Sequence, residues 1–486
     1  MAPVASNNSV NDVLGRLGLD DHGEVLNQNP YAKHPLLPVN HEIAGTDPES
    51  VIFFNNVKIL DCTGKEPYQG NCLIKGQRIV ATGPNATLPA QYKERARVIE
   101  GNGRTLMPGL CDAHTHFTWN NGGNLDALGE LPVEEHLLFA IRAARTYLDS
   151  GFTSCLGAAS AKDRLDVVCR DAINAGDIAG PRYLANAKEI AKRDGCLIAS
   201  ITAFADGPQE MAQVAQANVD LGADQIKLSM SGEEITESMH AEDNYFSVEE
   251  TKAACDVAHA AGKRVCAHAR SGESVKVGIE NGVDIIYHAS FAEKEEWDLA
   301  EKHKDHIWVA PGVNWIVATL NDAAAFGYPP EKAEAVGYKK ELAACIRSMK
   351  EFKKRGVKIL PGGDYGFAWT PHGTYARDLQ WFVELFDHTP MEAILAATAL
   401  GGDIFMRPHE LGKVLPGYYA DLLLVDGNPL DDVRLLQDHD KLNYILINGR
   451  IHKQCKADEA PAPPIAGQDG GRHVIVPNKG FLRTLH

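Results

Sequence analysis

Two histidines separated by one residue are the first side chains in this sequence that could do chemistry together. His114 and His116 end the stretch Met107-Pro-Gly-Leu-Cys-Asp-Ala-His-Thr-His116, which is apolar at its start. Side chains alternate across a β-strand with a period of two, so a strand here would point both imidazoles to one side, at a spacing that suits a shared metal ion. The alternative is a strand with two buried, hydrogen-bonded histidines, and the pair alone does not decide between them.

The elements that must position this pair are predicted to be strands alternating with helices. Short apolar runs predict strands over 106–116, 152–157, 182–187, 225–230, 264–269, 284–289, 306–311 and 358–364. Apolar residues recurring three and four positions apart predict helices over 132–150, 208–221, 248–261, 274–281, 293–302 and 330–355. This alternation indicates an α/β fold of the (β/α)8 or TIM-barrel type, whose active site forms at the C-terminal ends of the strands.

The segments on both sides of the barrel are predicted to be β-rich. Glycine-punctuated strands over 51–60, 71–81 and 97–99, and further strands over 412–430 and 442–453, predict one small β-sandwich built from both ends of the chain. We expect four regions: an N-terminal arm over 1–44 with a short helix over 10–19, the small domain over 45–105 and 411–457, the barrel over 106–410, and a C-terminal tail over 458–486.

Further metal-ligand candidates follow the apolar runs of later strands. They are Lys227, His268, His288 and Asp364, at the ends of the fourth, fifth, sixth and eighth predicted strands. Each alone has an ordinary interpretation: a lysine that reaches solvent, a hydrogen-bonded core histidine, or an aspartate that caps a turn. Together with His114 and His116, they would be costly to bury at one barrel mouth unless they were paired or bound metal.

Lys227 is the unusual member of this set, because an amine is a poor partner for histidines around a divalent cation. Its chemistry fits if the amine has reacted with carbon dioxide, since the resulting carbamate is a carboxylate-like group that can bridge two metal ions. From the sequence, we therefore hypothesise that Lys227 is carboxylated.

Composition limits the classes of partner. The formal net charge of -17 argues against a nucleic-acid partner and against an anionic membrane surface. The ten cysteines are scattered singly, which is typical of reduced thiols in a cytosolic protein. No apolar run is long enough to span a membrane. We expect a cytoplasmic location, with secretion left open if a signal peptide was removed, and a homo-oligomer.

These features resemble the amidohydrolase superfamily, in the subgroup of imidazolonepropionase-like proteins, prolidase-type dipeptidases and ochratoxinase. The resemblance covers nearly the whole chain after the arm. It rests on Gly103-Arg-Thr-Leu-Met-Pro-Gly-Leu-Cys-Asp-Ala-His-Thr-His116, on the four later candidates, and on Gly417-Tyr-Tyr-Ala-Asp-Leu-Leu-Leu-Val-Asp-Gly-Asn-Pro429 with Ile447-Asn-Gly-Arg450.

The resemblance implies a role for each candidate. His114, His116 and Asp364 resemble the ligands of a more buried metal, His268 and His288 those of a second metal, and carboxylated Lys227 the bridge. A hydroxide shared by the two ions would attack the substrate carbonyl. Asp364 would accept the proton of the attacking water and pass it to the leaving nitrogen.

The implied activity is hydrolysis of a non-protein amide by a binuclear metal-dependent enzyme. Expected substrates are an N-acyl amino acid, a dipeptide or an ochratoxin-like aryl amide. Alternatives are hydrolysis of a cyclic amide or lactone, a mononuclear deaminase, and a catalytically inactive assembly protein. We expect two divalent ions, with zinc first, although histidine and carboxylate ligands also admit manganese, cobalt or iron.

Two loops leave the substrate open. Many relatives carry a Gly-Gly-His-Gly-type loop after strand three, whereas this chain has Lys192-Arg-Asp-Gly-Cys-Leu197, without histidine. Aromatic and polar residues near the later strand ends are candidates for shaping an apolar pocket, as an alternative to plain loop packing. They are Tyr287, Asn314, Trp315, Trp369 and His372.

Overall fold

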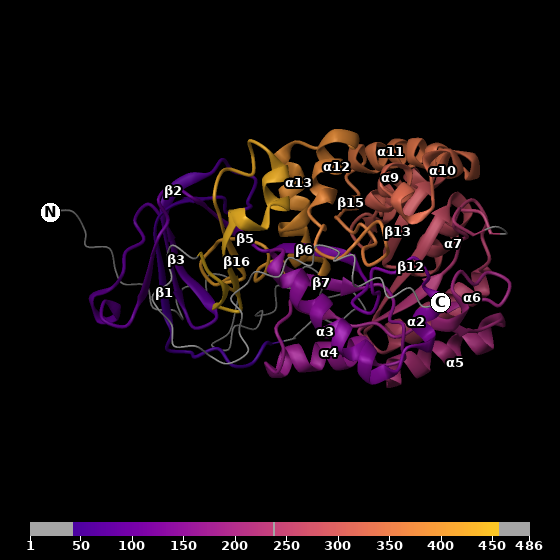
Figure 1. Ribbon diagram of the computed structural model, residues 1–486, viewed down its shortest axis with the longest axis horizontal. Helices are drawn as coiled ribbons and strands as arrows, with labels where there is room; N and C mark the ends of the chain where they lie inside the picture. Colours follow the sequence, from indigo (N-terminus) through magenta and orange to yellow (C-terminus); the bar gives the residue numbers. More distant parts are fainter. Residues whose placement is uncertain (1–41, 237–238, 456–486) are drawn as a thin grey trace.

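The computed structural model describes residues 42–236 and 239–455. Most of the predicted N-terminal arm, including its helix, and the whole predicted tail lie outside the described residues. Figure 1 shows two regions side by side: strands from both ends of the chain lie on the left, and strands alternating with helices lie on the right.

Strands from the two ends of the chain share one mixed sheet, of order β18-β17-β16-β5-β1-β2-β3 with β4 beside β1. The two ends meet where β5 pairs antiparallel with β16. A turn at Gly76, with a φ of 55°, divides the single strand predicted over 71–81 into β2 and β3. The sandwich of two sheets stays a prediction. The bounds are β1 (Val51–Ile59), β2 (Tyr68–Lys75), β3 (Arg78–Gly83), β4 (Arg97–Glu100), β5 (Thr105–Pro108), β16 (Leu422–Val425), β17 (Leu442–Ile447) and β18 (Arg450–Lys453).

Parallel strands form the second region, in sheets of order β6-β7-β8 and β10-β9-β11-β12-β13-β14-β15. Backbone hydrogen bonds cross between the sheets on both sides, from Asp224 N to Ala185 O at 2.8 Å and from Ala113 N to Pro361 O at 2.9 Å. The result is a TIM-barrel-like α/β fold. The bounds are β6 (Leu110–Thr115), β7 (Phe152–Gly157), β8 (Arg182–Leu184), β9 (Glu189–Ala191), β10 (Thr202–Phe204), β11 (Gln225–Ser229), β12 (Arg264–Ser271), β13 (Ile285–Phe291), β14 (Trp308–Ala310) and β15 (Lys358–Ile359).

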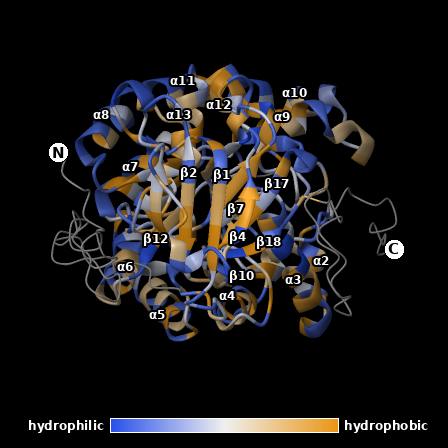
Figure 2. Ribbon diagram, turned by 90° about the vertical axis from the view of Figure 1, so that its left-hand side faces the viewer, coloured by the Kyte–Doolittle hydropathy of each residue, from blue (hydrophilic) through white to orange (hydrophobic). Residues whose placement is uncertain are grey.

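Helices surround these parallel strands and bury one face each. In α3, for example, Ala140, Ala143, Ala144 and Tyr147 are buried at helical spacing. Figure 2 shows hydrophobic residues concentrated on central strands such as β7 and hydrophilic residues on outer helices such as α8. The bounds are α2 (Asp126–Glu130), α3 (Val133–Asp149), α4 (Leu165–Ala175), α5 (Gly207–Asp220), α6 (Val248–Ala260), α7 (Gly272–Asn281), α8 (Lys294–His303), α9 (Val313–Asn321), α10 (Pro330–Val336), α11 (Tyr338–Lys354), α12 (Arg377–Leu385), α13 (Pro390–Ala397) and α14 (Ala399–Ile404).

Two further predicted elements are divided where the backbone changes direction. The helix predicted over 330–355 is two helices, because Gly337 adopts a φ of 119° between α10 and α11. The strand predicted over 106–116 is also two, with β5 in the small sheet and β6 among the parallel strands. Gly109 lies at this crossing point, and a Cβ there would lie only 2.1 Å from Thr153 Oγ1. The pair His114 and His116 therefore belongs to β6 and its end, one step after the chain has crossed between the two regions.

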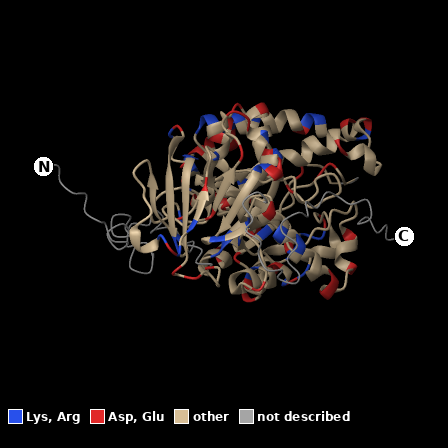
Figure 3. Ribbon diagram, turned by 60° about the vertical axis from the view of Figure 1, so that its left-hand side comes forward, with Lys and Arg blue, Asp and Glu red and all other residues tan. Residues whose placement is uncertain are grey.

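The distribution of charged residues on the surface and the free state of the cysteines are ordinary for a globular protein. Figure 3 shows Lys and Arg interspersed with Asp and Glu over the outer helices. All ten cysteines are free, and eight of them are buried. Among the described residues, no helix combines the length and apolarity needed to cross a membrane.

A buried ion pair joins the two regions. Arg182, in β8, donates from Nε to Asp421 Oδ2 at 2.7 Å and from Nη2 to Asn448 Oδ1 at 2.7 Å. Both charged side chains are almost fully buried, and the guanidinium also lies 4.2 Å from the centre of the Tyr419 ring. A buried carboxylate that loses its cation keeps its full desolvation cost.

Replacing Arg182 by Met should therefore lower the free energy of unfolding by about 3 kcal/mol, because Asp421 would be left buried without a counter-charge. Urea unfolding monitored by circular dichroism measures this loss. The matched control is Arg434→Ala, which breaks an exposed pair with Asp432 and should leave the free energy of unfolding nearly unchanged. Equal, small losses in both variants would contradict the role of the buried pair.

Candidate metal centre

The first two candidate ligands come from β6. Because the strand alternates, His114 and His116 point to one side, while Thr115 between them donates from Oγ1 to Leu156 O at 2.7 Å. Aromatic rings hold both imidazoles in place. The ring of Trp119 stacks on His116 at 3.6 Å between centroids, and that of Tyr287 stacks on His114 at 3.9 Å.

Asp364 reaches the same place from the segment after β15. Its backbone φ is 61°, a left-handed conformation that costs a non-glycine residue of order 1 kcal/mol and that aims the carboxylate at the histidine pair. Asp364 Oδ1 lies 3.0 Å from His116 Nε2 and 3.5 Å from His114 Nε2. The three side chains are buried, with their ligand atoms within 4.8 Å of one another.

The tautomer of His116 makes this contact informative. Its Nδ1 lies 3.2 Å from Ala159 O, so Nδ1 is the nitrogen that carries the proton and donates. Its Nε2 faces the Asp364 carboxylate, and neither atom has another hydrogen-bond partner among the described residues. Positive charge is needed between these two atoms, and either a proton on Nε2 or a bound cation would supply it. A divalent metal ion fits this donor set of two imidazoles and a carboxylate.

The protonation of the neighbouring groups supports metal binding. Burial lowers the pKa of His114 well below its ordinary value, which keeps the imidazole neutral. Burial alone would raise the pKa of Asp364, but the positive charge that His114 and His116 carry when protonated, together with that of Lys227, holds it below its ordinary range. Neutral imidazoles and an ionised carboxylate are the forms that bind divalent cations.

His268, in β12, and His288, in the neighbouring β13, form a second set. His268 Nδ1 faces His288 Nε2 at 3.0 Å. His268 Nε2 lies 3.0 Å from Gly232 O, so the proton resides on Nε2 and the lone pair on Nδ1 faces His288. Burial lowers the pKa of both imidazoles well below the ordinary value. Residue His288 also has a left-handed φ of 73°. The pair could hold a second ion through Nδ1 of His268 and Nε2 of His288.

Lys227, in β11, lies beside both sets and is buried. Its Nζ is 3.8 Å from Glu189 Oε2 and 5.2 Å from the centre of the Tyr287 ring. Glu189, the first residue of β9, was missed in the sequence, because a single glutamate in a short strand belongs to no recognisable metal-ligand motif. The pair with Glu189 gives an unmodified amine a counter-charge, so carboxylation of Lys227 stays a hypothesis.

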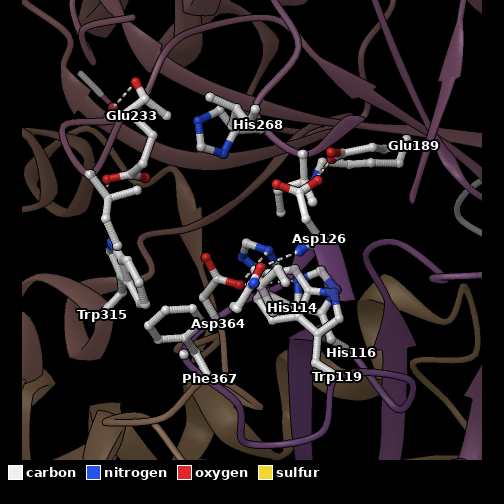
Figure 4. Close-up of a pocket in the computed structure, with 18 residues that line it drawn as sticks. His114, His116, Trp119, Asp126, Glu189, Glu233, His268, Trp315, Asp364 and Phe367 are labelled. Atoms are coloured by element: carbon white, nitrogen blue, oxygen red, sulfur yellow. Dashed lines mark hydrogen bonds and ion pairs between the residues drawn. The ribbon is translucent and has the colours of Figure 1, made fainter. Parts of the chain in front are cut away.

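Most of these side chains line a cavity of about 290 Å³, shown in Figure 4, whereas His288 is not among the lining residues. His114, His116, Lys227, His268 and Asp364 form its base. Other lining residues are Trp119, Gly123, Asn124, Leu125, Asp126, Glu189, Leu197, Ile198, Glu233, Ile235, Thr236, Trp315 and Phe367. A largely apolar cavity with convergent polar groups is the usual form of a small-molecule site.

Of the five predicted substrate contacts, Trp315 lines this cavity and the other four lie behind its walls. Tyr287 is packed under His114. Asn314 accepts from Trp381 Nε1, and Trp369 donates to Thr319 Oγ1 while packing against Trp315.

His372 Nε2 lies 2.8 Å from Trp119 O, which fixes the loop that carries Trp119. Trp119, Glu233 and Phe367 were missed as wall residues, although Trp119 could have been suspected from its place just after His116. Asp126, at the start of α2, was missed because it lies far along a loop from the histidine pair.

Comparisons with known proteins show which family has these features. The chain matches the family model for the amidohydrolase family over residues 105–452. It is 27% identical to an ochratoxinase from Aspergillus niger, over 85% of this chain and 88% of that protein. It is 24% identical to an imidazolonepropionase from Salinispora tropica, over 73% of this chain and 85% of that protein.

Solved structures agree with the sequence relatives. A prolidase complexed with N-methylphosphonate-L-proline superposes with a TM-score of 0.74 at 25% identity, over 83% of this chain and all of that one. The A. niger ochratoxinase structure gives a TM-score of 0.73 at 23% identity, over 84% of this chain and 96% of that one. With parallel strands whose ends carry the histidines and aspartate described above, and with a family match over most of its length, this chain belongs to the amidohydrolase family.

Proposed function

We propose that this protein is a binuclear metal-dependent hydrolase that cleaves a carbon–nitrogen amide bond of a small molecule. The observation that carries the proposal is the buried cluster of His114, His116 and Asp364, in which His116 Nε2 lies 3.0 Å from the carboxylate. His268 and His288 lie on adjacent strands with Nδ1 and Nε2 3.0 Å apart, and the same two nitrogens could bind a second ion in place of the hydrogen bond between them. Burying so many ionisable groups is costly unless they are paired or bind cations.

His114, His116 and Asp364 would hold one ion, and His268 and His288 the second, with carboxylated Lys227 as the bridge. Zinc is the first expectation for both. When bound, such ions polarise a carbonyl and make water a stronger nucleophile near neutral pH. Asp364 is ionised, and in the proposed reaction it would accept a proton from the attacking water and then donate it to the leaving nitrogen. The products are a carboxylate and an amine.

The size of the cavity favours a small substrate over a protein chain. An N-acyl amino acid, a dipeptide or an ochratoxin-like aryl amide fits this volume, and ochratoxinase and prolidase are the names borne by its relatives. Trp315 and Phe367 would contact an apolar or aromatic part of it. Hydrolysis of a cyclic amide or lactone is the second choice, because the same attack works on any polarised carbonyl. A hydrolysis panel read by mass spectrometry tests these classes directly.

Two alternative functions would require a different role for Lys227. A mononuclear deaminase needs no bridge, and the Glu189 pair would then keep the amine unmodified. A catalytically inactive assembly protein would need no metal at all. We also propose, from sequence, a cytoplasmic homo-oligomer with the domain boundaries given above.

Replacing Lys227 by Ala should reduce the metal content from close to two ions per chain to one or none, because the bridging ligand is lost. Elemental analysis of the purified proteins measures this, and hydrolysis should fall by about 100-fold or more. The control is Lys276→Ala, which removes an exposed lysine paired with Glu295 and should leave metal content unchanged. One tightly held ion in both the parent and the Lys227 variant would rule out the binuclear centre.

Replacing Asp364 by Asn should lower kcat by about 100-fold to 10,000-fold, because the amide cannot accept the proton of the attacking water. Steady-state kinetics on whichever amide the panel identifies, with metal content measured in parallel, give the comparison. Asp426→Asn, at an exposed pair with Lys441, serves as the control. A kcat of the Asp364→Asn variant within about tenfold of the parent value would assign proton transfer to another group.

A further inference from the structure

The charged residues around the cavity are mostly acidic. Asp126, Glu189 and Glu233 line it in addition to Asp364, whereas Lys227 is the one Lys or Arg among the described lining residues. Lys227 already lies within the metal centre, beside Glu189. In the described part of the chain, the wall therefore offers no separate cation to bind a carboxylate group of a substrate.

Glu233 is one of the buried members of this acidic wall, and the positive charge beside it is shared with another carboxylate. Its Oε1 accepts from Tyr338 Oη at 2.9 Å and from Trp315 Nε1 at 3.3 Å, and its Oε2 pairs with Arg270 Nη2. Arg270 is fully buried and is shared with a second buried carboxylate, Glu341, through Nη1. One guanidinium thus serves two carboxylates.

When both carboxylates are ionised, this sharing leaves the cluster with one more negative than positive charge next to the cavity. A carboxylate has about four lone-pair positions, and the three described donors leave one position of Glu233 open. Burial raises the pKa of Glu233 above its ordinary range, against the opposing effect of Arg270. A further cation would therefore stabilise the ionised carboxylate.

Aromatic rings complete this side of the cavity. Trp315 and Phe367 meet edge to face with centroids 5.1 Å apart, and Trp369 supports Trp315 from behind at 5.6 Å. Figure 4 shows Glu233 and Trp315 on the side of the cavity away from Glu189 and Trp119, with Asp364 and His268 between them. A wall of aromatic faces and a carboxylate is a typical binding surface for ammonium groups.

We propose that Glu233, with Trp315, selects amide substrates that carry a positively charged amine and disfavours those that carry a free carboxylate on this side of the cavity. The inference rests on the proposed hydrolase function and narrows its substrate class. The carbonyl would lie over the histidines and Asp364, and the ammonium group would lie against Glu233.

The first test is hydrolysis by the metal-loaded protein of three para-nitroanilides whose acyl chains have equal length and end in an ammonium, a methyl or a carboxylate group. The ammonium compound should have the highest kcat/KM, by about tenfold or more over the methyl compound, with the carboxylate compound lowest. In Glu233→Gln the ammonium and methyl compounds should become nearly equal. Equal or reversed preference in the unmodified protein would overturn the proposal.

The matched control is Glu234→Gln. Glu234 is the neighbouring residue, equally buried, but it pairs with His240 and does not line the cavity. This variant should keep the preference for the ammonium compound. Loss of the preference in both variants would mean that the loop, and not the Glu233 carboxylate, sets it.

A second test does not depend on catalysis. Calorimetry should show phenethylammonium binding about tenfold or more tightly than phenethyl alcohol, with the difference lost in Glu233→Gln. Equal binding, or a difference that survives in that variant, would overturn the role of Glu233. If none of the anilides is hydrolysed while the binding difference holds, the hydrolase proposal fails for such amides and the assignment of Glu233 stands.

Discussion

The candidate centre of this protein depends on a buried carboxylate held against two imidazoles. His116 Nε2 and Asp364 Oδ1 lie 3.0 Å apart, and Nδ1 of His116 faces Ala159 O on the other side of the ring. Both side chains have lost water, so the ionised carboxylate is favourable here only with positive charge beside it. A proton on His116 Nε2 or a bound cation would supply that charge. In either case the backbone must hold these side chains close together.

Several features of the fold provide that rigidity. Trp119 and Tyr287 stack on the two β6 imidazoles and fix their rings. His288 and Asp364 have left-handed backbone conformations, which the surrounding packing must maintain. Gly232 O and Ala159 O each fix a tautomer, so the lone pairs point to the cavity. Partners that orient the ligands in this way commonly control metal affinity as strongly as the ligands do.

Much of the fold could be predicted because its signals are local. Parallel strands are apolar, and the polar residue at each C-terminal end stands out against such a run. His268 and His288 were located in this way: they lie in β12 and β13, and His268 lines the cavity. The predictions were less successful where the chain turns within an apolar pattern, as at Gly109 and Gly337, because periodicity does not report a change of direction.

The sequence by itself determined the family, the alternation of strands and helices, and the residues that gather at the strand ends, since these depend on residue type and spacing along the chain. Only the tertiary structure decided which side chains share a space. It paired Lys227 with Glu189, placed Glu233 against Trp315 and Arg270, and put Asn314, Trp369 and His372 behind the wall. The physical reason is that loops after different strands meet only once the strands are assembled. The residues that line the cavity are therefore far apart in the sequence, and no periodic pattern in the sequence reveals their contacts.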